Sequence, residues 1–181
     1  INEGVIVTIQ TGSAERIAAR GIGIDGQLRS ASSGRLDINS SGSFRLDQNA
    51  SIVGRATDTL PLGGTRPPSE YNKGANGGSY GGYGGQGAGN TDPLFEPYGT
   101  KFGLDSAGGS PGGNVQVSEG VETLGGAGGK SVLISGTNVT IAGQIDVSGG
   151  NGQNGVVGPQ GPGGGAGGGS GGNILIEASN D

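Results

Sequence analysis

Glycine at every third position is the sequence feature that most constrains what this chain can fold into. In the segment 149–172 it occurs at Gly149, Gly152, Gly155, Gly158, Gly161, Gly164 and Gly167, and Ser170 ends the frame. A three-residue period with glycine along one edge is what an extended left-handed helix needs in order to lie against another backbone. About seven triplets with little proline are too few to hold a collagen-like triple helix alone. We therefore expect an extended segment packed on a β scaffold, with a flexible glycine linker as the alternative.

The composition predicts a folded chain with a thin core. The 181 residues fit one domain or two small ones, and they include 46 glycines, 4% aromatic residues and no Cys, Met, Trp or His. With so few large apolar side chains, stability must come from backbone hydrogen bonds and close glycine packing. Glycine and serine enrichment also favours disorder. Several β-branched runs are nevertheless too apolar to stay in water, namely 5–9, 132–134, 139–141 and 174–176, so we expect a folded protein.

Charge and composition also exclude several classes of partner. The net charge of −5 and the lack of any basic stripe argue against nucleic acid and anionic membranes. No segment approaches the roughly 18 apolar residues of a membrane span. Without Cys or His there is no disulfide framework and no thiolate or imidazole metal site, and we expect no cofactor. The chain begins without Met or a signal sequence, so we expect a removed leader or a piece of a longer chain.

Residues 1–62 have the pattern of a strand-rich region. Apolar residues alternate along 5–9, which predicts a strand that is buried on at least one face. Residues 13–20 fit either one or two helical turns or a second strand, and we favour the strand.

The tripeptide Arg-Leu-Asp occurs twice, at 35–37 and 45–47. A chain reversal over 39–43 would satisfy apolar and charged pairs in a single register, which predicts a hairpin or an equivalent strand–turn–strand corner. The pairs would be Ile38 with Phe44, Leu36 with Leu46, Asp37 with Arg45, and Arg35 with Asp47.

Residues 63–113 form a glycine- and tyrosine-rich insertion. Its glycines again share a three-residue frame, and Tyr80 and Tyr83 are three residues apart. In a helix with three residues per turn both rings would stand on one side. The segment therefore predicts either a low-complexity loop or a surface ridge that stacks on a sugar or a neighbouring subunit. We expect residues 93–102 to pack back onto the β core, because they carry Phe95, Tyr98 and Phe102.

Residues 114–181 return to a β pattern with internal repeats. Diglycine precedes a β segment at 112–117, 128–134 and 171–176. The sequence Ile-Asp-Gly-Gln-Leu at 24–28 also resembles Ile-Ala-Gly-Gln-Ile at 141–145. Repeated short strands with glycine-rich turns predict an all-β solenoid in which each coil buries its apolar side against the next. We expect the regions 1–62, 63–113 and 114–181 to form one folded unit.

Four glycine-rich stretches carry a family resemblance: Gly-Gly-Ser-Tyr-Gly-Gly-Tyr-Gly-Gly at 77–85, Gly-Gly-Ser-Pro-Gly-Gly-Asn-Val-Gln-Val at 108–117, and the runs 128–152 and 167–178. They resemble large glycine-rich surface and adhesin-like proteins. The resemblance implies a right-handed parallel β-helix of the pectin-lyase-like type, with glycine-rich insertions in polyglycine- or polyproline-II-like conformation. It also implies a secreted, fibrous or cell-surface role, with carbohydrate-active sites in some members.

The charged residues do not predict an enzyme. Carbohydrate-processing β-helix proteins need clustered carboxylates, or a carboxylate with Arg or Lys, in a groove. The candidates for such a set are Arg35, Asp37, Arg45 and Asp47, and cross-strand ion pairs explain them more simply.

Other site motifs are sparse. Asp25, Asp105 and Asp146 lie near glycines but form no EF-hand and no GGxGxD calcium repeat. Three sequons make Asn39, Asn49 and Asn138 candidate glycosylation sites, and we expect Asn39, in the predicted turn, to be the most accessible.

The two ends of the chain carry the main functional prediction. Each is an apolar strand without a charged or proline-bearing cap, and uncapped strand edges polymerise unless something covers them. We expect Val5, Val7, Ile9, Ile174 and Ile176 to form an assembly interface. The leading hypothesis is a non-enzymatic structural protein of an extracellular filament or cell-surface fibre, its partner being a further copy or a neighbouring module of one long chain. The alternative is a carbohydrate-binding domain of an adhesin, with Tyr80 and Tyr83 stacking on glycans; an ice-binding protein would need a regular threonine array that the sequence lacks.

Overall fold

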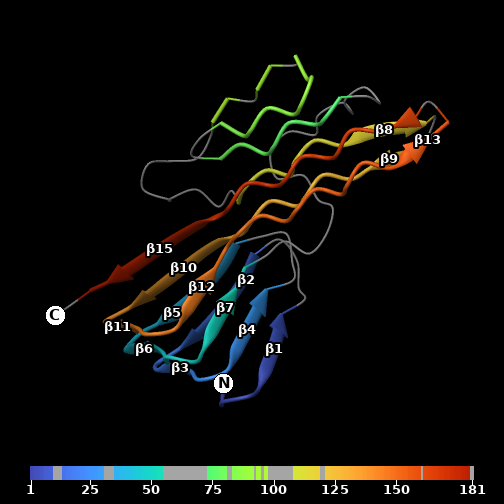
Figure 1. The fold of residues 1–181 in the computed structure, drawn as a ribbon. Helices are drawn as coiled ribbons and strands as arrows, with labels where there is room; N and C mark the ends of the chain where they lie inside the picture. The colour runs from blue at the N-terminus through green and yellow to red at the C-terminus, as the bar shows by residue number, and fades with distance from the viewer. Residues whose placement is uncertain are drawn as a thin grey trace.

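The computed structural model describes residues 1–9, 14–30, 35–54, 73–80, 83–91, 93–94, 96–97, 108–118, 121–159 and 161–179. Within these ranges the regular secondary structure is entirely β, and no helix occurs. The molecule has two parts: a block of short strands, and a layer of glycine-rich extended segments that continues from one side of that block (Figure 1). The predicted packing of 93–102 onto the core falls largely outside the described residues, as do Phe95, Tyr98, Phe102 and Asp105.

The strand block consists of three small sheets, which we call sheets A, B and C. Sheet A has the order β1 (Ile6–Ile9), β4 (Gln27–Ser30), β7 (Ser51–Val53), β12 (Gln144–Asp146). Sheet B has the order β15 (Asn173–Ala178), β10 (Ser131–Gly136), β5 (Arg35–Ser40), β2 (Ala14–Ala19). Sheet C has the order β11 (Asn138–Ile141), β6 (Ser43–Leu46), β3 (Ile22–Ile24). Every pairing in these three sheets is parallel.

Successive strands along the chain lie in sheets B, C and A in a repeating order. The strands β2, β3 and β4 lie in sheets B, C and A in turn, and the triplets β5–β6–β7 and β10–β11–β12 repeat this course. Consecutive strands therefore never pair with each other within the block. Two antiparallel pairs lie in the glycine-rich part, β8 (Val115–Ser118) with β9 (Val121–Thr123), and β13 (Val157–Gly158) with β14 (Gly161–Pro162).

The predicted fold class is confirmed only as all-β, and the prediction of a right-handed parallel β-helix solenoid is wrong. The described strands form several small, mostly parallel sheets, and none of these sheets is closed. Each of these sheets holds three or four parallel strands, and glycine-rich segments precede β10 and follow β12. Such segments have no side chains to fill a layer between sheets, and they pack backbone against backbone instead.

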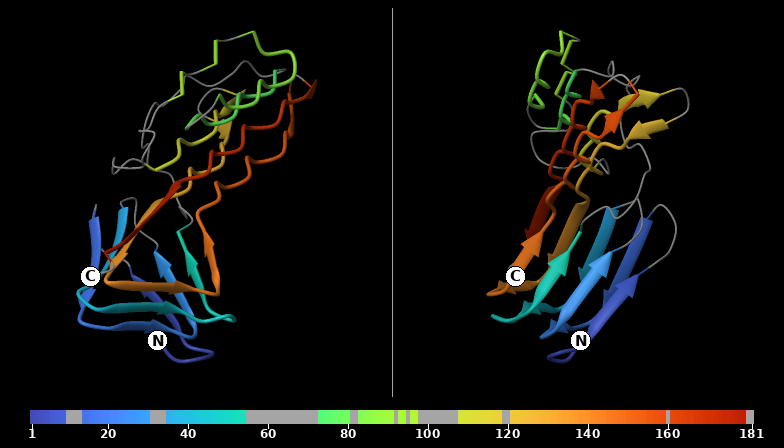
Figure 2. Two further views of the ribbon diagram at one scale, coloured as in Figure 1. Left: turned by 90° about the vertical axis from the view of Figure 1, so that its left-hand side faces the viewer. Right: turned by 45° about the vertical axis from the view of Figure 1, so that its right-hand side comes forward.

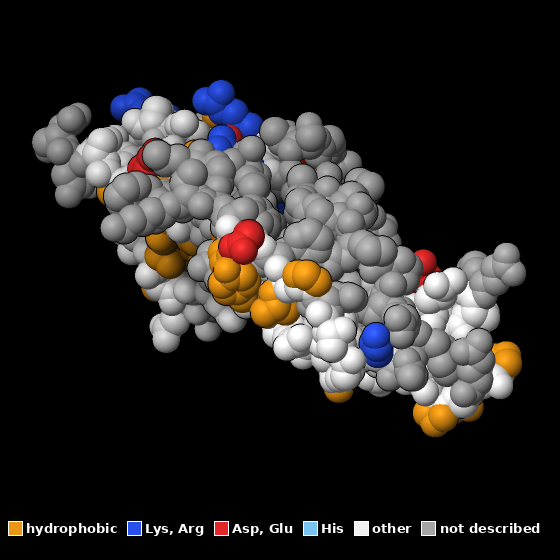
Figure 3. Space-filling model, turned by 90° about the horizontal axis from the view of Figure 1, so that it is seen from above, with side chains coloured by type: hydrophobic (Ala, Val, Ile, Leu, Met, Phe, Trp, Pro, Cys, Tyr) orange, Lys and Arg blue, Asp and Glu red, His pale blue; other side chains and the backbone are white. Residues whose placement is uncertain are grey.

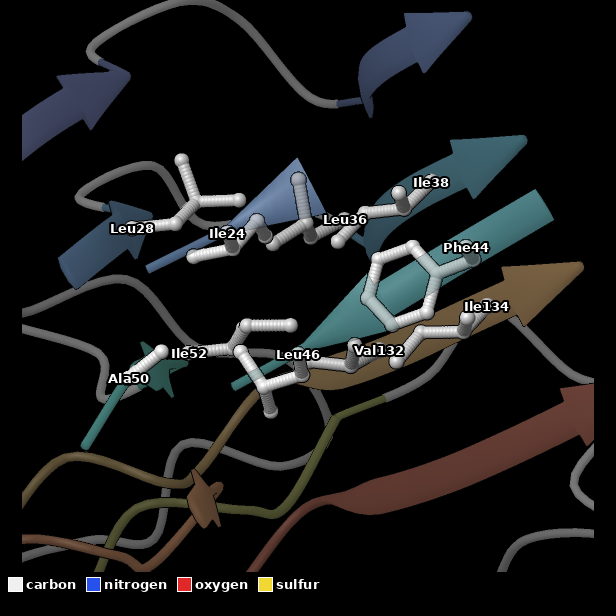
Figure 4. Packing of buried hydrophobic residues seen from close by; sticks show 10 residues of the cluster. All are labelled: Ile24, Leu28, Leu36, Ile38, Phe44, Leu46, Ala50, Ile52, Val132 and Ile134. Carbon is white, nitrogen blue, oxygen red and sulfur yellow. The ribbon is translucent and has the colours of Figure 1, made fainter. Parts of the chain in front are cut away.

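The apolar core lies between the three sheets (Figure 4). The strands β5, β6 and β7, which lie in the middle of the block, contribute inward-facing residues to this core. These include Leu36 and Ile38 from β5, Phe44 from β6 and Ile52 from β7. The complete cluster is Ile24, Leu28, Leu36, Ile38, Phe44, Leu46, Ala50, Ile52, Val132 and Ile134. Phe44 is its one aromatic member, as expected for a chain with so few large apolar residues.

The echo between 24–28 and 141–145 marks one corner of the strand block. Ile24 and Ile141 lie in the same lateral row of sheet C, on either side of Leu46. At the corner itself, a Cβ on Gly26 would lie 2.4 Å from the backbone oxygens of Asn2 and Val5. A Cβ on Gly143 would lie equally close, at 2.4 Å, to two oxygens of the turn below it. The repeat therefore encodes the same tight corner at two levels, where only glycine fits.

The predicted hairpin over 35–47 does not form. The strands β5 and β6 belong to different sheets, so the chain turns a corner at Ser41 and Gly42 instead of reversing. The four apolar residues of the prediction are all buried, but they face the core from two sheets. The predicted ion pairs are also wrong: Arg35 binds Asp37, and Arg45 binds Asp47 at 2.8 Å. Each arginine reaches the carboxylate two residues further on, which lies on the same outward face.

The glycine-rich layer is a bundle of extended segments centred on 163–172 (Figure 2). Amides in this segment donate to carbonyls in 147–153 and 110–113, and its carbonyls accept from amides in 75–78 and 126–129. These backbone hydrogen bonds measure 2.7–3.0 Å, and many recur at three-residue intervals. On the described part of the face seen from above, hydrophobic side chains lie in small separate groups (Figure 3).

The glycine frame fits against backbone as predicted, although its neighbour is different. A Cβ on Gly149, Gly152 or Gly155 would lie 2.1–2.3 Å from a backbone oxygen. Those oxygens belong to residues 163–169, because the chain reverses through β13 and β14 and packs on itself. The segment thus lies against other glycine-rich chain, not on a β scaffold as predicted.

Candidate assembly site

The strand β1 is the terminal strand of sheet A and is open to solvent. The prediction that it is buried on at least one face is wrong, because Val5, Ile6 and Val7 are all exposed and Ile9 is only half-buried. Val7 aligns with the buried Leu28 of β4 and so faces the core side. It remains 38% exposed because no described strand covers this end of the block.

The strand β15 is the terminal strand of sheet B at the opposite end of the block. Ile174 and Ile176 align with Val132 and Ile134, which are fully buried. They face the core side but are 42% and 46% exposed. Four of the five predicted interface residues therefore lie on terminal strands, two at each end of the block: Val7 and Ile9 on β1, and Ile174 and Ile176 on β15. Val5 directly precedes β1.

A polar hollow of about 610 Å³ lies beside the end of β15. It is open on one side and follows the corner between sheets B and C. Hydroxyl groups and one carboxylate dominate its lining, which comprises Asn39, Ser40, Ser41, Ser135, Gly136, Thr137, Ile176, Glu177, Ala178 and Ser179.

The structure gives Tyr80 and Tyr83 different surroundings. Tyr80 is half-buried, and its hydroxyl accepts a hydrogen bond of 3.2 Å from Asn173 at the start of β15. Tyr83 is exposed, and its hydroxyl donates to Glu96 at 2.8 Å, which raises the pKa of this tyrosine. The interpretation of both as carbohydrate-stacking residues stays a prediction.

The three sequon asparagines differ in exposure. Asn39 lies in β5 and is half-buried, so the prediction that it sits in a turn and is the most accessible is wrong. Asn49 lies in the corner before β7, and Asn138 begins β11; both are exposed. Of the aspartates near glycine, Asp146 is engaged by Ser148, which donates to it at 2.6 Å.

A buried polar cluster of Glu15, Ser30 and Lys130 was not foreseen. The ammonium of Lys130 donates to the Ser30 hydroxyl at 2.7 Å, and that hydroxyl donates to Glu15 Oε2. All three residues are at most 2% exposed. Burial lowers the pKa of Lys130 to about 8, against the opposing attraction of the Glu15 charge.

The cluster joins three separate parts of the chain. Glu15 lies in β2, Ser30 ends β4, and Lys130 follows the glycine-rich segment that leads into β10. Since the hydroxyl is closed to solvent, we interpret the cluster as a link between the strand block and the glycine-rich layer. A sequence signal did exist. Each member lies two residues from an apolar residue of the core or packed against it, and residues at this spacing face the same side of extended chain. The pairs are Glu15 with Ile17, Ser30 with Leu28, and Lys130 with Val132.

The charged residues considered for catalysis lie on outward faces. The hydrogen bond from Arg35 to Asp37 raises the pKa of Arg35, and the charge of Glu177 adds to this effect. Arg45 and Asp47 form a separate pair on another sheet. The structure therefore does not bring these four residues together in one groove.

Searches for related proteins identify no family: no family model, curated protein or solved structure matches this chain. The resemblance to glycine-rich adhesin-like proteins stays a prediction for that reason. Within the described ranges, no cluster of acidic, His or Cys side chains has the make-up of a metal site. The same part of the chain has no helix that could cross a membrane.

Proposed function

We propose that this protein is a non-enzymatic structural subunit that assembles head-to-tail into an extracellular filament or cell-surface fibre. The observation that supports the proposal is the offset between sheets A and B. At one end of the block, sheet A extends beyond β2 and β3 by the single strand β1. At the other end, sheet B extends beyond β11 and β12 by the single strand β15.

Both terminal strands have the properties of sites that recruit another chain. An edge strand exposes a row of backbone donors and acceptors, and another strand can pair with them. Here the edges also carry half-exposed apolar side chains such as Val7, Ile174 and Ile176. Burying apolar area of this kind contributes about 25 cal/mol per Å².

A second copy of the chain is the occupant that fits both ends. All strands in the three sheets are parallel, so a copy placed further along the stack presents strands of the same direction. The contact joins one end of a subunit to the opposite end of the next, and contacts of this heterologous kind extend into filaments unless the rotation closes a ring.

The proposal is tested by electron microscopy and sedimentation of the purified chain across a dilution series. We expect filaments for the native sequence, and none for Ile176→Lys or Val7→Lys, because each places a charge on an apolar edge. Val157→Lys is the matched control, since Val157 is 81% exposed on β13. This strand lies in the glycine-rich part, away from β1 and from the exposed end of β15 (Figure 1). Discrete particles of the native chain at every concentration would overturn the proposal.

A further inference from the structure

The way in which the subunits join rests on the head-to-tail assembly proposed above. We infer that they overlap by one level: β15 of one subunit pairs with β2 of the next, while β1 of the next subunit pairs with β12 of the first. The joint is thus made of two strand pairings on two different sheets.

The strand order supplies the reason. Each complete level of the block has one strand in each sheet, as in β2, β3 and β4. The strand β1 stands alone below the first complete level, in sheet A, and β15 stands alone above the last, in sheet B. Placed at the same level, the two single strands fill different sheets and do not collide. A stacking that keeps them at separate levels would interrupt both sheet A and sheet B, whereas the overlap interrupts sheet C alone.

The registers within the subunit predict the contacts on the core side. Ile176, Ile134, Ile38 and Ile17 form one lateral row across sheet B. Continuing that row places Ile17 of the next subunit beside Ile176. In sheet A, the row of Ile145, Ile52, Leu28 and Val7 likewise places Val7 of the next subunit beside Ile145. Side chains that are exposed at both ends would thereby extend the apolar core.

The outward face of the joint is complementary in charge. Glu177 on β15 shares a lateral row with Ser135, Asn39 and Ala18. In the overlap it lies beside Ala18 of the next subunit, between the exposed Arg16 and Arg20. A carboxylate flanked by two guanidinium groups makes this face of the joint complementary in charge.

Sheet C has no single strand to contribute at the shared level. Its outermost strands, β11 of one subunit and β3 of the next, would be separated across the joint by one level without a strand. The polar hollow at the corner of sheets B and C lies on this side. Its hydroxyl lining is compatible with an opening that remains in contact with water.

Paired cysteines test the register directly, because the chain has no cysteine of its own. Ile6 and Gln144 lie in one row of sheet A, separated by Gln27 and Ser51. Within a subunit they are three strand spacings apart, about 14 Å, which is too far for a disulfide. Across the joint they become neighbours on parallel strands. Single variants Ile6→Cys and Gln144→Cys are mixed and oxidised, and covalent dimers are measured.

We expect dimers from the mixture and none from either variant alone. Ile6→Cys mixed with Ile145→Cys is the control, because these side chains point to opposite faces of the sheet. Filaments by microscopy without dimers from the first mixture would overturn the overlap while leaving the assembly proposal in place. Dimers from one variant alone would also overturn it, since they require a two-fold contact. If neither dimers nor filaments form, both proposals fail.

Discussion

Lys130 donates a hydrogen bond of 2.7 Å to Ser30, a residue 100 positions earlier in the chain. Ser30 in turn donates to Glu15, and all three side chains are closed to solvent. The Lys130 ammonium and the Glu15 carboxylate are therefore linked by hydrogen bonds through the neutral hydroxyl of Ser30. This arrangement ties the stability of the strand block to the entry of the glycine-rich layer.

Stability should increase with pH above neutrality because of Lys130. Burial lowers the pKa of this lysine in the folded chain to about 8, from an ordinary value of 10.5. The unfolded chain thus binds more protons than the folded chain between these values, so the free energy of unfolding rises across that pH range. We expect a gain of about 2–3 kcal/mol, measured by denaturant unfolding at pH 7 and pH 10. Lys130→Met should lose this rise; an unchanged pH profile in the variant would contradict the assignment.

Removing one member of the cluster should cost more than removing both charges. Glu15→Ala leaves Lys130 buried with no carboxylate nearby, and we expect a loss of about 3–5 kcal/mol. The double variant Glu15→Met with Lys130→Met replaces the charges by apolar groups of similar size and should be less destabilised than Glu15→Ala. Urea denaturation of the single and double variants measures the coupling. Strictly additive losses would show that the two charges do not interact.

Neighbouring glycines should respond very differently to alanine. A Cβ on Gly172 would lie 1.8 Å from the carbonyl oxygen of Lys130, whereas one on Gly171 would meet its nearest atom at 3.7 Å. We expect Gly172→Ala to lower the free energy of unfolding by at least about 2 kcal/mol, because backbone must move to admit the methyl group. Gly171→Ala should change it by less than about 0.5 kcal/mol. Thermal denaturation of both variants measures these changes in stability. Equal losses of stability would mean that the segments are not packed this closely.

Reversing one charge across the proposed joint should weaken assembly, and reversing both charges should restore it. Glu177→Lys opposes Arg16 and Arg20 of the next subunit, and Arg20→Glu opposes Glu177. Each exposed pair contributes about 0–1 kcal/mol, so either single change should raise the critical concentration for assembly about two- to fivefold. The double variant should recover most of this loss, and about 1 M salt should reduce all the differences. Sedimentation at two salt concentrations measures the critical concentration of each variant. Single variants that assemble like the native chain would argue against this contact.

Strand positions could be predicted from the sequence, but strand partners could not. The apolar runs at 132–134, 139–141 and 174–176 all lie in strands, and 14–19 is a strand as favoured. The charges of 35–47 suggested a hairpin because alternation along a strand is the same for a hairpin and for a corner. The actual partners of β5 are β2 and β10, the second almost a hundred residues later. Nothing local to 35–47 specifies these pairings.

The same limit applies to the candidate sites. The apolar strands near both ends could be predicted, since Val7 and Ile176 belong to short runs of apolar residues in the sequence. Their division between opposite ends depends on the strand order of two different sheets. The cluster of Glu15, Ser30 and Lys130 was missed because its members lie in three separate segments of the chain, and only the packing of these segments brings the side chains together.

The sequence by itself determined that this protein is all-β, that its core is thin, and that glycine edges must lie against backbone. These properties follow from composition and from short periods, which act through local geometry and through the absence of a Cβ. Only the tertiary structure decided that the glycine-rich segments pack on each other, because backbone hydrogen bonds carry no side-chain code for their partner. It also decided that single strands project at opposite ends of sheets A and B, since that offset arises from the order of strands along the stack.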